Sequence, residues 1–472
     1  MATLPQTPAP SISGEPERIV VKTAIPGPRS EELRARHGKH QDARTVHFYQ
    51  DAKRSLGNYM VDVDGNVLLD VYGHIAAIAI GYNHPVMLEA WKSGRFDWAA
   101  GYRPSLGIAP SEEWVDIVER TLMRIAPKGM TRVMTVTSGA EAVENAIKAA
   151  FVRLAKRRRK GAAPTDEELA ACMRNEQTMA NGFKVLSFEG GFHGRSLGAL
   201  SLTRSKAIHK LDFPAFAWPT APFPSNRFPL DANKDHNREV EARSLEAVEK
   251  VFRAHPGEVA AIIIEPIQGE GGDNHASPEF FRALRKLTLE HEVAFIADEV
   301  QTCAGVTGAF WAHEAWNLPE PPDMVTFSKK MQLGGYYCRE EFFPADALRI
   351  FNTFLGDPIR LAQLEVIVEV MDRDRLIEHT SITGTMLLGE LTRLSETYPS
   401  LLSNARGRGT FAAIDARDPQ AQGRILAGVR KRGLEAGGCG TRSLRFRPAL
   451  VFGPRHVAEA ISVIEDACKE VA

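Results

Sequence analysis

Two adjacent lysines stand where a buried strand is expected to end. Residues 323–335 are DMVTFSKKMQLGG, so Lys329 and Lys330 follow the apolar run MVTFS and precede a pair of glycines. A lysine amine in a partly desolvated cleft has a lowered pKa and can attack a carbonyl carbon to form a Schiff base. A solvated surface position is the alternative for either lysine. The glycines at 334–335 suggest room for backbone beside a ligand.

Carboxylates follow two other apolar runs. Asp298 and Glu299 come directly after VAFIA, with Gln301 three residues beyond Asp298, and both Glu265 and Glu270 come after VAAIII. A carboxylate that leaves a buried strand for a cleft is costly unless it meets a cation or a protonated ring nitrogen. A structural salt bridge or a helix cap is the alternative in each case.

Two small-residue segments could bind a phosphorylated, planar ligand. In TSGAEAVENAIKAA (137–150), Ser138 and Glu141 predict a capping box, and Gly139 and Ala140 leave the first N–H groups of a helix open to phosphate. An unoccupied helix cap is the alternative. In FEGGFHGRSLG (188–198), glycines surround the other candidates. There Phe192 and His193 could stack on a ring, and Arg195 could bind a carboxylate with two parallel hydrogen bonds. A glycine-rich surface loop explains this second segment equally well.

These candidates follow short, almost continuous apolar runs that alternate with helical segments such as 278–291. This pattern is typical of a mostly parallel sheet covered on both faces, so the predicted fold class is α/β. Open sheets of this kind bind ligands at the carboxyl ends of their strands. The predicted strands lie at 132–137, 183–188, 259–265, 293–299 and 323–328.

The domain organisation follows from changes in these patterns. Residues 1–105 are expected to form an N-terminal arm and a segment of a smaller domain, including a hairpin that turns at Asp64-Gly65-Asn66. Residues 106–360 are expected to form the large α/β domain. Residues 361–472 are expected to complete a smaller α+β domain.

Composition excludes several classes of function. The net charge of the 472 residues is −1, which gives no basic surface for nucleic acid. No run of about 18 apolar residues predicts a membrane span. The five cysteines are odd in number and lack zinc-like spacing, so we expect reduced thiols and no metal site. The first 20 residues resemble neither a secretory signal nor a mitochondrial presequence, and we therefore expect a cytoplasmic protein.

Taken together, the motifs resemble those of the class III pyridoxal-phosphate aminotransferases, which have fold type I. The likeness extends from PGPRSEEL (26–33) to SLRFRPALVF (443–452). Its most specific stretches are GGFHGRSLG, EPIQGEGGDNHAS, ADEVQTCAGVTGAFWAHE and FSKKMQLGGYY. Within the family, EGGDNHAS and FSKKM are most similar to the eukaryotic members that act on 4-aminobutyrate.

The resemblance implies a role for each cofactor-binding candidate. Lys329 would form the Schiff base with pyridoxal 5′-phosphate and move the proton, and Asp298 would pair with the ring nitrogen. Gln301 would lie near the phenolic oxygen, and Phe192, next to His193, would stack on the ring. The phosphate would be bound by Ser138, Gly139 and Ala140, with Thr353 donated by a second copy, so a homodimer with shared active sites is implied.

The resemblance also implies a substrate pocket for 4-aminobutyrate and 2-oxoglutarate. Arg195 would hold the carboxylate farther from the reacting carbon. Arg445, preferred to Arg447, would hold the nearer one and would be neutralised by Glu270 when 4-aminobutyrate binds. Ile75 and Tyr72 would line the apolar end of the pocket.

Alternatives within the family stay open. They are another ω-amino acid aminotransferase, of the β-alanine or ornithine type, and a decarboxylase of the same class. Some animal members have Cys-x-x-Cys at the positions of Ser138 and Glu141 and bind an iron–sulfur cluster there. Neither Ser138 nor Glu141 supplies a thiolate, so no cluster is expected.

Overall fold

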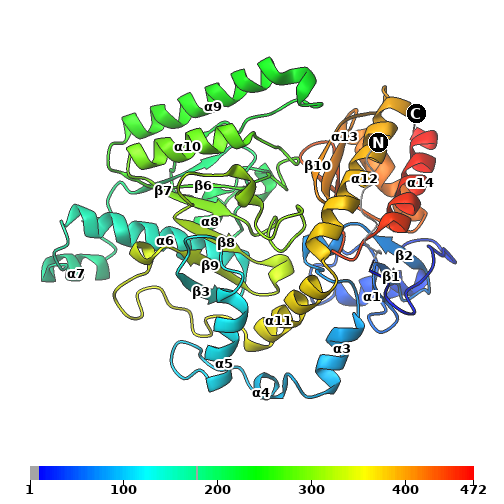
Figure 1. The fold of residues 1–472 in the computed structure, drawn as a ribbon, viewed down its shortest axis with the longest axis horizontal. Coiled ribbons are helices and arrows are strands. Elements are labelled where there is room, and N and C mark those ends of the chain that lie inside the picture. The colour runs from blue at the N-terminus through cyan, green and yellow to red at the C-terminus, as the bar shows by residue number, and fades with distance from the viewer. Residues whose placement is uncertain (1–9, 177–178, 472) are drawn as a thin grey trace. The chain divides into compact units, whose positions relative to one another are not determined.

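The computed structural model describes residues 10–176 and 179–471 of the chain. The described residues divide into two compact units (Figure 1). Unit 1 comprises residues 10–97, 304–310 and 365–471, and unit 2 comprises the described residues of 98–303 and 311–364. The predicted N-terminal arm lies in unit 1 from residue 10 onward, where Ile12 is buried and Val20 pairs with Val67; its first nine residues lie outside the described chain.

Unit 2 is built on a seven-stranded sheet with the order β3-β9-β8-β7-β6-β4-β5. The pairs from β8 to β5 are parallel, whereas β9 pairs antiparallel with both of its neighbours. The sheet is therefore mostly parallel, as predicted, and all five predicted runs form strands. The strands are β3 (Arg132–Val136), β4 (Lys184–Phe188), β5 (Thr220–Ala221), β6 (Val259–Ile264), β7 (Ala294–Asp298), β8 (Met324–Phe327) and β9 (Gly334–Cys338).

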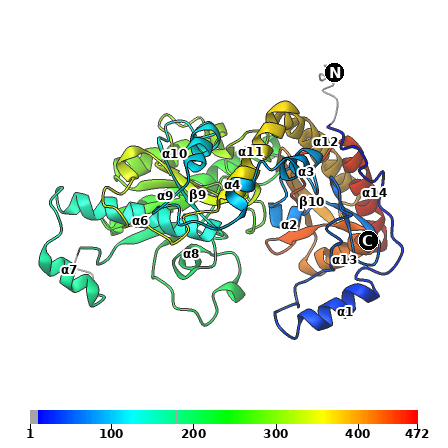
Figure 2. The ribbon, with the colours of Figure 1, turned by 90° about the horizontal axis from the view of Figure 1, so that it is seen from below.

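Helices cover the sheet of unit 2. The long helix α6 (Gly139–Arg158) packs against β6, β8 and β9, and its buried alanines and Val143 allow a close approach. The helix α10 (Pro278–Glu290), predicted from its periodicity, packs on β7, and α9 (Lys234–Ala254) runs beside it (Figures 1 and 2). The shorter helices are α5 (Glu112–Ile117), α7 (Asp166–Met173) and α8 (Leu197–Leu202).

The glycine pair after the two lysines opens β9 and makes room for neighbouring backbone, as expected; that this room lies beside a ligand stays a prediction. A Cβ added to Gly334 would lie 2.4 Å from the backbone oxygen of Ser138, and one added to Gly335 would lie 2.6 Å from that of Met134. These glycines therefore let β9 approach β3 and the start of α6.

Unit 1 contains two small sheets. The predicted hairpin forms β1 (Tyr59–Val61) and β2 (Val67–Asp70), and β12 (Leu434–Glu435) adds to β2 in parallel. A second, antiparallel sheet has the order β10-β11-β14-β13. Its strands are β10 (Leu402–Arg408), β11 (Phe411–Ala416), β13 (Gly437–Cys439) and β14 (Ser443–Phe446).

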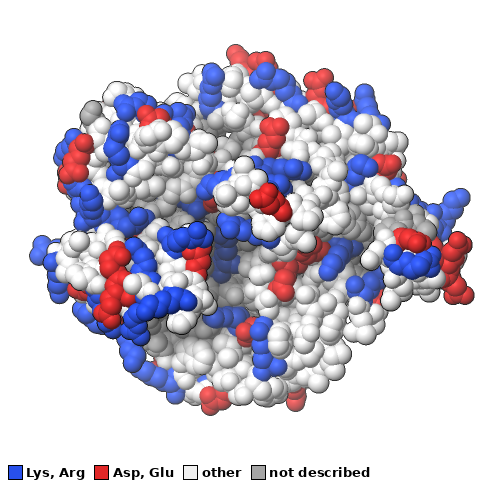
Figure 3. Space-filling model, turned by 180° about the vertical axis from the view of Figure 1, so that it is seen from behind, with Lys and Arg blue, Asp and Glu red and all other residues white. Residues whose placement is uncertain are grey.

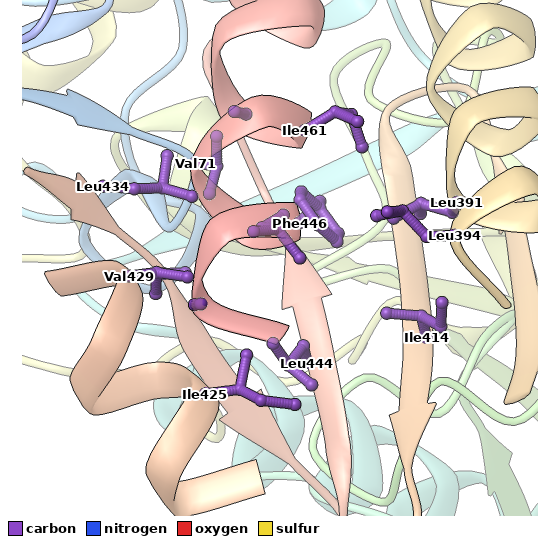
Figure 4. Close-up of a cluster of buried hydrophobic side chains, with 14 of the residues drawn as sticks. Val71, Leu391, Leu394, Ile414, Ile425, Val429, Leu434, Leu444, Phe446 and Ile461 are labelled. Atoms are coloured by element: carbon purple, nitrogen blue, oxygen red, sulfur yellow. The ribbon is translucent and has the colours of Figure 1, made fainter. Parts of the chain in front are cut away.

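The core of unit 1 lies between this antiparallel sheet and its helices. Figure 4 shows Leu391 and Leu394 near Ile414 and Phe446, all of them fully buried. Because α12 packs on β10 and β11 while α13 packs on α14, one apolar cluster joins these elements. The helices are α1 (Pro28–His37), α3 (Pro85–Lys92), α12 (Leu376–Thr397), α13 (Pro419–Lys431) and α14 (Pro454–Val471), and α11 (Pro358–Arg373) begins in unit 2 and ends in unit 1.

A short left-handed turn, α2 (Gly73–Ala76), follows β2 in unit 1. The φ angles are 59° at Gly73, 47° at His74, 61° at Ile75 and 67° at Ala76. The N–H of Ala76 donates to the carbonyl of Tyr72 over 3.0 Å, which closes a left-handed helical turn. Left-handed backbone costs an L-residue about 1–2 kcal/mol. Three such residues in succession therefore require support from their surroundings.

The surface carries no broad region of a single charge on the face that Figure 3 shows. Lysine and arginine side chains lie interspersed with aspartate and glutamate side chains there. Within residues 10–176 and 179–471, no helix combines the length and the apolar character that crossing a membrane would require.

Candidate active site

A cavity of about 240 Å³ in unit 2 brings most of the predicted cofactor-binding residues together. It opens where β4, β6, β7 and β8 end and where α6 begins, which is the sheet edge that the sequence predicted. Its lining residues are Gly139, Ala140, Phe192, His193, Gly194, Glu265, Asp298, Val300, Gln301, Thr302, Ser328 and Lys329.

Asp298, the last residue of β7, is held firmly at the cavity. Its side chain is buried and accepts hydrogen bonds from the Thr326 hydroxyl over 2.9 Å and from the Val300 N–H over 3.1 Å. Its second oxygen lies 2.7 Å from Nδ1 of His193. Such a carboxylate has a fixed orientation and can hold a proton on a heterocycle nitrogen.

Glu265 is a second buried carboxyl in the cavity wall. Its oxygens accept hydrogen bonds from the N–H groups of Phe192 over 2.9 Å and Gly269 over 3.1 Å. Burial raises the pKa of Glu265 to about 7; His193 opposes the rise and the charge of Asp298 adds to it. Glu265 thus fixes the backbone at Phe192, whose ring lines the cavity.

The first turn of α6 offers open N–H groups to the cavity. Ser138 is the N-cap and accepts a hydrogen bond from the Glu141 N–H over 3.3 Å, whereas the Glu141 carboxylate accepts from the N–H of Thr137. The predicted cap is present, but the Glu141 carboxylate accepts from the N–H of Thr137 and not from that of the N-cap residue Ser138. A Cβ on Gly139 would lie 2.7 Å from Val300, so only glycine fits this wall of the cavity.

The two lysines have different environments. The chain turns sharply after β8, and Lys329 has a φ of 53°, in the left-handed region. Lys329 lines the cavity, whereas Lys330 does not and is only 1% exposed. The solvated alternative for Lys330 is therefore wrong, and of the pair it is Lys329 that the cavity offers as a nucleophile.

The predicted carboxylate-binding residues of unit 2 do not line this cavity. Arg195 is exposed and lies two residues before α8, where the N–H groups of Gly198 and Ala199 donate to Glu144. Glu270 forms an ion pair with Lys206 at 2.7 Å. Lys206 and Arg195 both act on His209, whose pKa is lowered chiefly by burial and further by these two cations. The two cations, His209 and Glu270 therefore share one electrostatic neighbourhood.

The remaining predicted residues lie elsewhere. Thr353 is an exposed residue of unit 2 and does not line the cavity. Tyr72, Ile75 and Arg445 all belong to unit 1. There Nη2 of Arg445 donates to the Tyr72 hydroxyl over 3.3 Å, with the guanidinium carbon 5.3 Å from the ring centroid. Ile75 is 48% exposed.

Arg447, the weaker candidate, is fully buried against protein. Its guanidinium carbon lies 3.3 Å from the centroid of the Phe411 ring, and Nη1 donates to the carbonyl of Phe446 over 2.8 Å. These contacts hold Arg447 inside unit 1, and the preference for Arg445 stays a prediction.

Comparison with known proteins agrees with this geometry. The family model described as aminotransferase class-III matches residues 40–468. The chain belongs to the class III aminotransferases. It is 47% identical over 470 residues to 4-aminobutyrate aminotransferase of Dictyostelium discoideum, which covers 100% of this chain and 95% of that protein. It is 44% identical to the human enzyme named 4-aminobutyrate aminotransferase, mitochondrial, over 95% of this chain and 90% of that protein.

Solved structures of class III enzymes have the same fold. A lysine aminotransferase from Mycobacterium tuberculosis, in the internal aldimine form, is 30% identical and has a TM-score of 0.84 over 94% of this chain and all of that one. An amine transaminase from an uncultivated Pseudomonas species, 24% identical with a TM-score of 0.73 over 89% of this chain and 94% of that one, shares the fold. The prediction of an α/β chain with fold type I is confirmed.

This class III aminotransferase depends on pyridoxal 5′-phosphate, and the residues of the cavity fit that group. The open N–H groups at Gly139 and Ala140 suit its phosphate, and the fixed Asp298 carboxylate suits a protonated ring nitrogen. Lys329 lines the same cavity and would supply an amine for the aldehyde.

Sequence reasoning missed two residues that contact predicted site residues. Thr326 orients Asp298 from the adjacent strand, and Lys206 pairs with Glu270. Thr326 sits within an apolar run, at a strand position level with Asp298 in the parallel pairing of β7 and β8, and that register was the signal that could have found it. Lys206 lies in an irregular loop, and no pattern in the sequence marks it.

Proposed function

We propose that this enzyme transfers the amino group of 4-aminobutyrate to 2-oxoglutarate, giving succinate semialdehyde and glutamate in two half-reactions. The observation that carries the proposal is the 47% identity, over nearly the whole of both chains, to a protein named 4-aminobutyrate aminotransferase. Four mammalian relatives with the same enzyme name are each 44% identical to this chain. β-Alanine is a plausible second donor because it is also an ω-amino acid.

The residues of the cavity would divide the chemistry among them. When bound, the cofactor supplies the electron sink for the carbon that loses a proton. Asp298 would keep the ring nitrogen protonated, because its carboxylate is already oriented by Thr326 and lies 2.7 Å from His193. The Lys329 amine would move the proton between the substrate carbon and C4′ of the cofactor. Phe192, fixed through its N–H by Glu265, would cover the face of the ring.

The two substrates differ in their charge next to the reacting carbon. 4-Aminobutyrate has no carboxylate there, whereas 2-oxoglutarate has one, so the site needs a cation that can be masked. We assign the distal carboxylate to Arg195 and the nearer one to Arg445, with Glu270 masking Arg445 for 4-aminobutyrate. Glu270 has Lys206 as a partner within unit 2, so releasing Arg445 would not leave this carboxylate without a cation.

We also propose a homodimer. Thr353 does not line the cavity of its own chain, so its proposed contact with the phosphate would be made in the cavity of a second copy. The location in the cell is proposed to be cytoplasmic. The names of the mouse and human relatives include the word mitochondrial, whereas the name of the Dictyostelium relative does not. Cell fractionation of the native organism tests the location, and light scattering tests the dimer.

The function is tested by single-turnover reactions of the cofactor-loaded enzyme with one donor at a time. 4-Aminobutyrate, β-alanine, ornithine and lysine are mixed separately with the enzyme, and loss of the cofactor's absorption band is followed. We expect 4-aminobutyrate to react fastest. If lysine or ornithine reacts and 4-aminobutyrate does not, the proposed substrate is wrong while the membership of the family stands.

A further inference from the structure

The left-handed turn at residues 73–76 of unit 1 carries two of the predicted substrate residues. Ile75 lies within it and Tyr72 directly precedes it. A β-branched residue such as isoleucine is a marked outlier at a φ of 61°, and the side chain of Ile75 is half exposed rather than packed in a core. Strained backbone of this kind persists where its surroundings enforce it, and it is common in functional sites.

Asp70, the last residue of β2, supports the start of this turn. Its Oδ1 accepts hydrogen bonds from the N–H groups of Tyr72 and Gly73, both over 2.8 Å. Its Oδ2 accepts one from the Tyr82 hydroxyl over 2.6 Å. Asp70 is 3% exposed, so these hydrogen bonds are not shared with bulk solvent.

The backbone directly after β14 contacts the turn from its other side. The N–H of Arg447 donates to the carbonyl of Val71 over 2.6 Å. A Cβ on Gly73 would lie 2.5 Å from the carbonyl oxygen of Arg447, so the two chain segments touch at this glycine. The turn is therefore clamped between the Asp70 carboxylate and the strand end that carries Arg445.

Tyr72 links this clamp to the arginine. Its hydroxyl accepts from Nη2 of Arg445, and its ring lies beneath the guanidinium. A Cβ on Gly437 would lie 2.3 Å from the Tyr72 ring, so the ring is confined from a third direction. The Tyr72 ring therefore contacts Arg445 and lies close to Gly437.

We propose that Asp70 and Tyr82 are positioning residues for binding the carboxylate next to the reacting carbonyl. Their hydrogen bonds hold the left-handed turn, the turn fixes Tyr72, and Tyr72 orients the guanidinium of Arg445. The role of Arg445 in this inference rests on the proposed function. Neither Asp70 nor Tyr82 is assigned contact with substrate.

The test compares the binding of two unreactive carboxylates to the cofactor-loaded enzyme by calorimetry. Glutarate has a carboxylate at each end and would use both arginines, whereas butyrate has one and would use only the distal site. The variants are Asp70→Ala, Asp70→Asn, Tyr82→Phe and the double variant Asp70→Ala with His74→Gly. Asparagine keeps an acceptor for the two N–H groups, and glycine at the exposed position 74 accepts a positive φ without strain.

We expect Asp70→Ala to lower the affinity for glutarate at least tenfold and the affinity for butyrate less than threefold. The affinities of Asp70→Asn for both ligands should be within threefold of those of the wild type. Tyr82→Phe should lower the affinity for glutarate about threefold. Adding His74→Gly should recover at least threefold of the glutarate affinity lost in Asp70→Ala, because the turn then needs less support. A merely structural role of Asp70 would weaken the binding of both ligands alike, with or without the glycine.

Equal loss of glutarate and butyrate binding, or unchanged glutarate binding in Asp70→Ala, would overturn the inference. If Asp70→Ala does not fold, Tyr82→Phe gives the same comparison with a single hydroxyl removed. The comparison uses no turnover, so it is separate from the donor screen. A wild type that reacts with lysine but not 4-aminobutyrate would refute the proposed function, whereas a loss without ligand preference would refute only the role of Asp70.

Discussion

The cavity of unit 2 contains a carboxylate that a regular sheet holds in place, whereas in unit 1 Tyr72 and Ile75 lie at a left-handed turn, which Tyr72 precedes and which includes Ile75. Asp298 ends a parallel strand and is oriented by Thr326 on the next strand. Tyr72 is oriented instead by backbone that the chain adopts only with support from Asp70. The first arrangement is rigid because the sheet is rigid, and the second is rigid because strain is offset locally. The two should therefore respond differently to mutation.

The largest effect is expected at the lysine of the cavity. Lys329→Ala should lower amino transfer at least about 10³-fold, because it removes both the nucleophile and the proton carrier. Lys330→Met is the matched control, since Lys330 is buried outside the cavity and methionine keeps its apolar stem.

Borohydride reduction followed by peptide mass spectrometry distinguishes the two lysines. The cofactor should be trapped on the peptide of the wild type and of Lys330→Met, and not on that of Lys329→Ala. Trapping on residue 330 would reverse the assignment. A fall in the thermal midpoint of Lys330→Met without loss of trapping is expected, because that ammonium has a buried structural position.

The next largest effect is expected in the left-handed turn. Gly73→Ala should lower the free energy of unfolding by about 2–5 kcal/mol. The added methyl group would meet the Arg447 carbonyl, and the alanine would have to adopt a φ of 59°. Gly161→Ala is the matched control: its φ is 85°, but no atom lies within 4 Å of the added methyl. Gly161→Ala should cost only about 1–2 kcal/mol.

Urea unfolding measures both variants. Equal destabilisation would mean that the turn is held by its φ angles alone and not by its contact with Arg447. Because the cavity of unit 2 depends on different elements, the borohydride trapping of Gly73→Ala should match that of the wild type under native conditions.

The contrast between the units also explains what the sequence could predict. The five apolar runs became strands because unbroken runs of Val, Ile and Phe are stable only when both faces of a sheet are covered. Asp298 and Lys329 could be placed because residues at the carboxyl ends of parallel strands meet at one edge. Strand β9 was missed because its two glycines resemble a loop, although they serve close packing against β3.

The left-handed turn could not be predicted from its own residues. Isoleucine and alanine have no local preference for a positive φ, and Ile75 strongly disfavours it. Its conformation depends on Asp70, Tyr82 and the Arg447 carbonyl, which lies more than 370 residues away in the sequence. The partner of Glu270 was missed for a similar reason, because Lys206 lies in an irregular loop.

The smallest effect, and the one that probes the cavity most finely, concerns Glu265. Burial raises its pKa to about 7 in the folded chain, from 4.5 for an unperturbed glutamate. The folded state therefore binds this proton more tightly than the unfolded state does. The resulting contribution to stability is fully present below about pH 4.5 and is lost as the pH rises through about 7. Between these values the cofactor-free wild type should lose about 3 kcal/mol of unfolding free energy at this site.

Glu265→Gln has no such proton, and its amide oxygen can still accept from Phe192 or Gly269. The difference in unfolding free energy between Glu265→Gln and the wild type should therefore shift in favour of the variant as the pH rises from 4.5 to 7.5. Glu258→Gln is the control of opposite sign, because the ion pair with Lys184 at 2.6 Å lowers the pKa of Glu258. Its stabilising charge is present at neutral pH and is lost on acidification. Parallel pH curves for wild type and Glu265→Gln would show that Glu265 keeps its charge throughout, and that the cavity tolerates two buried carboxylates near His193.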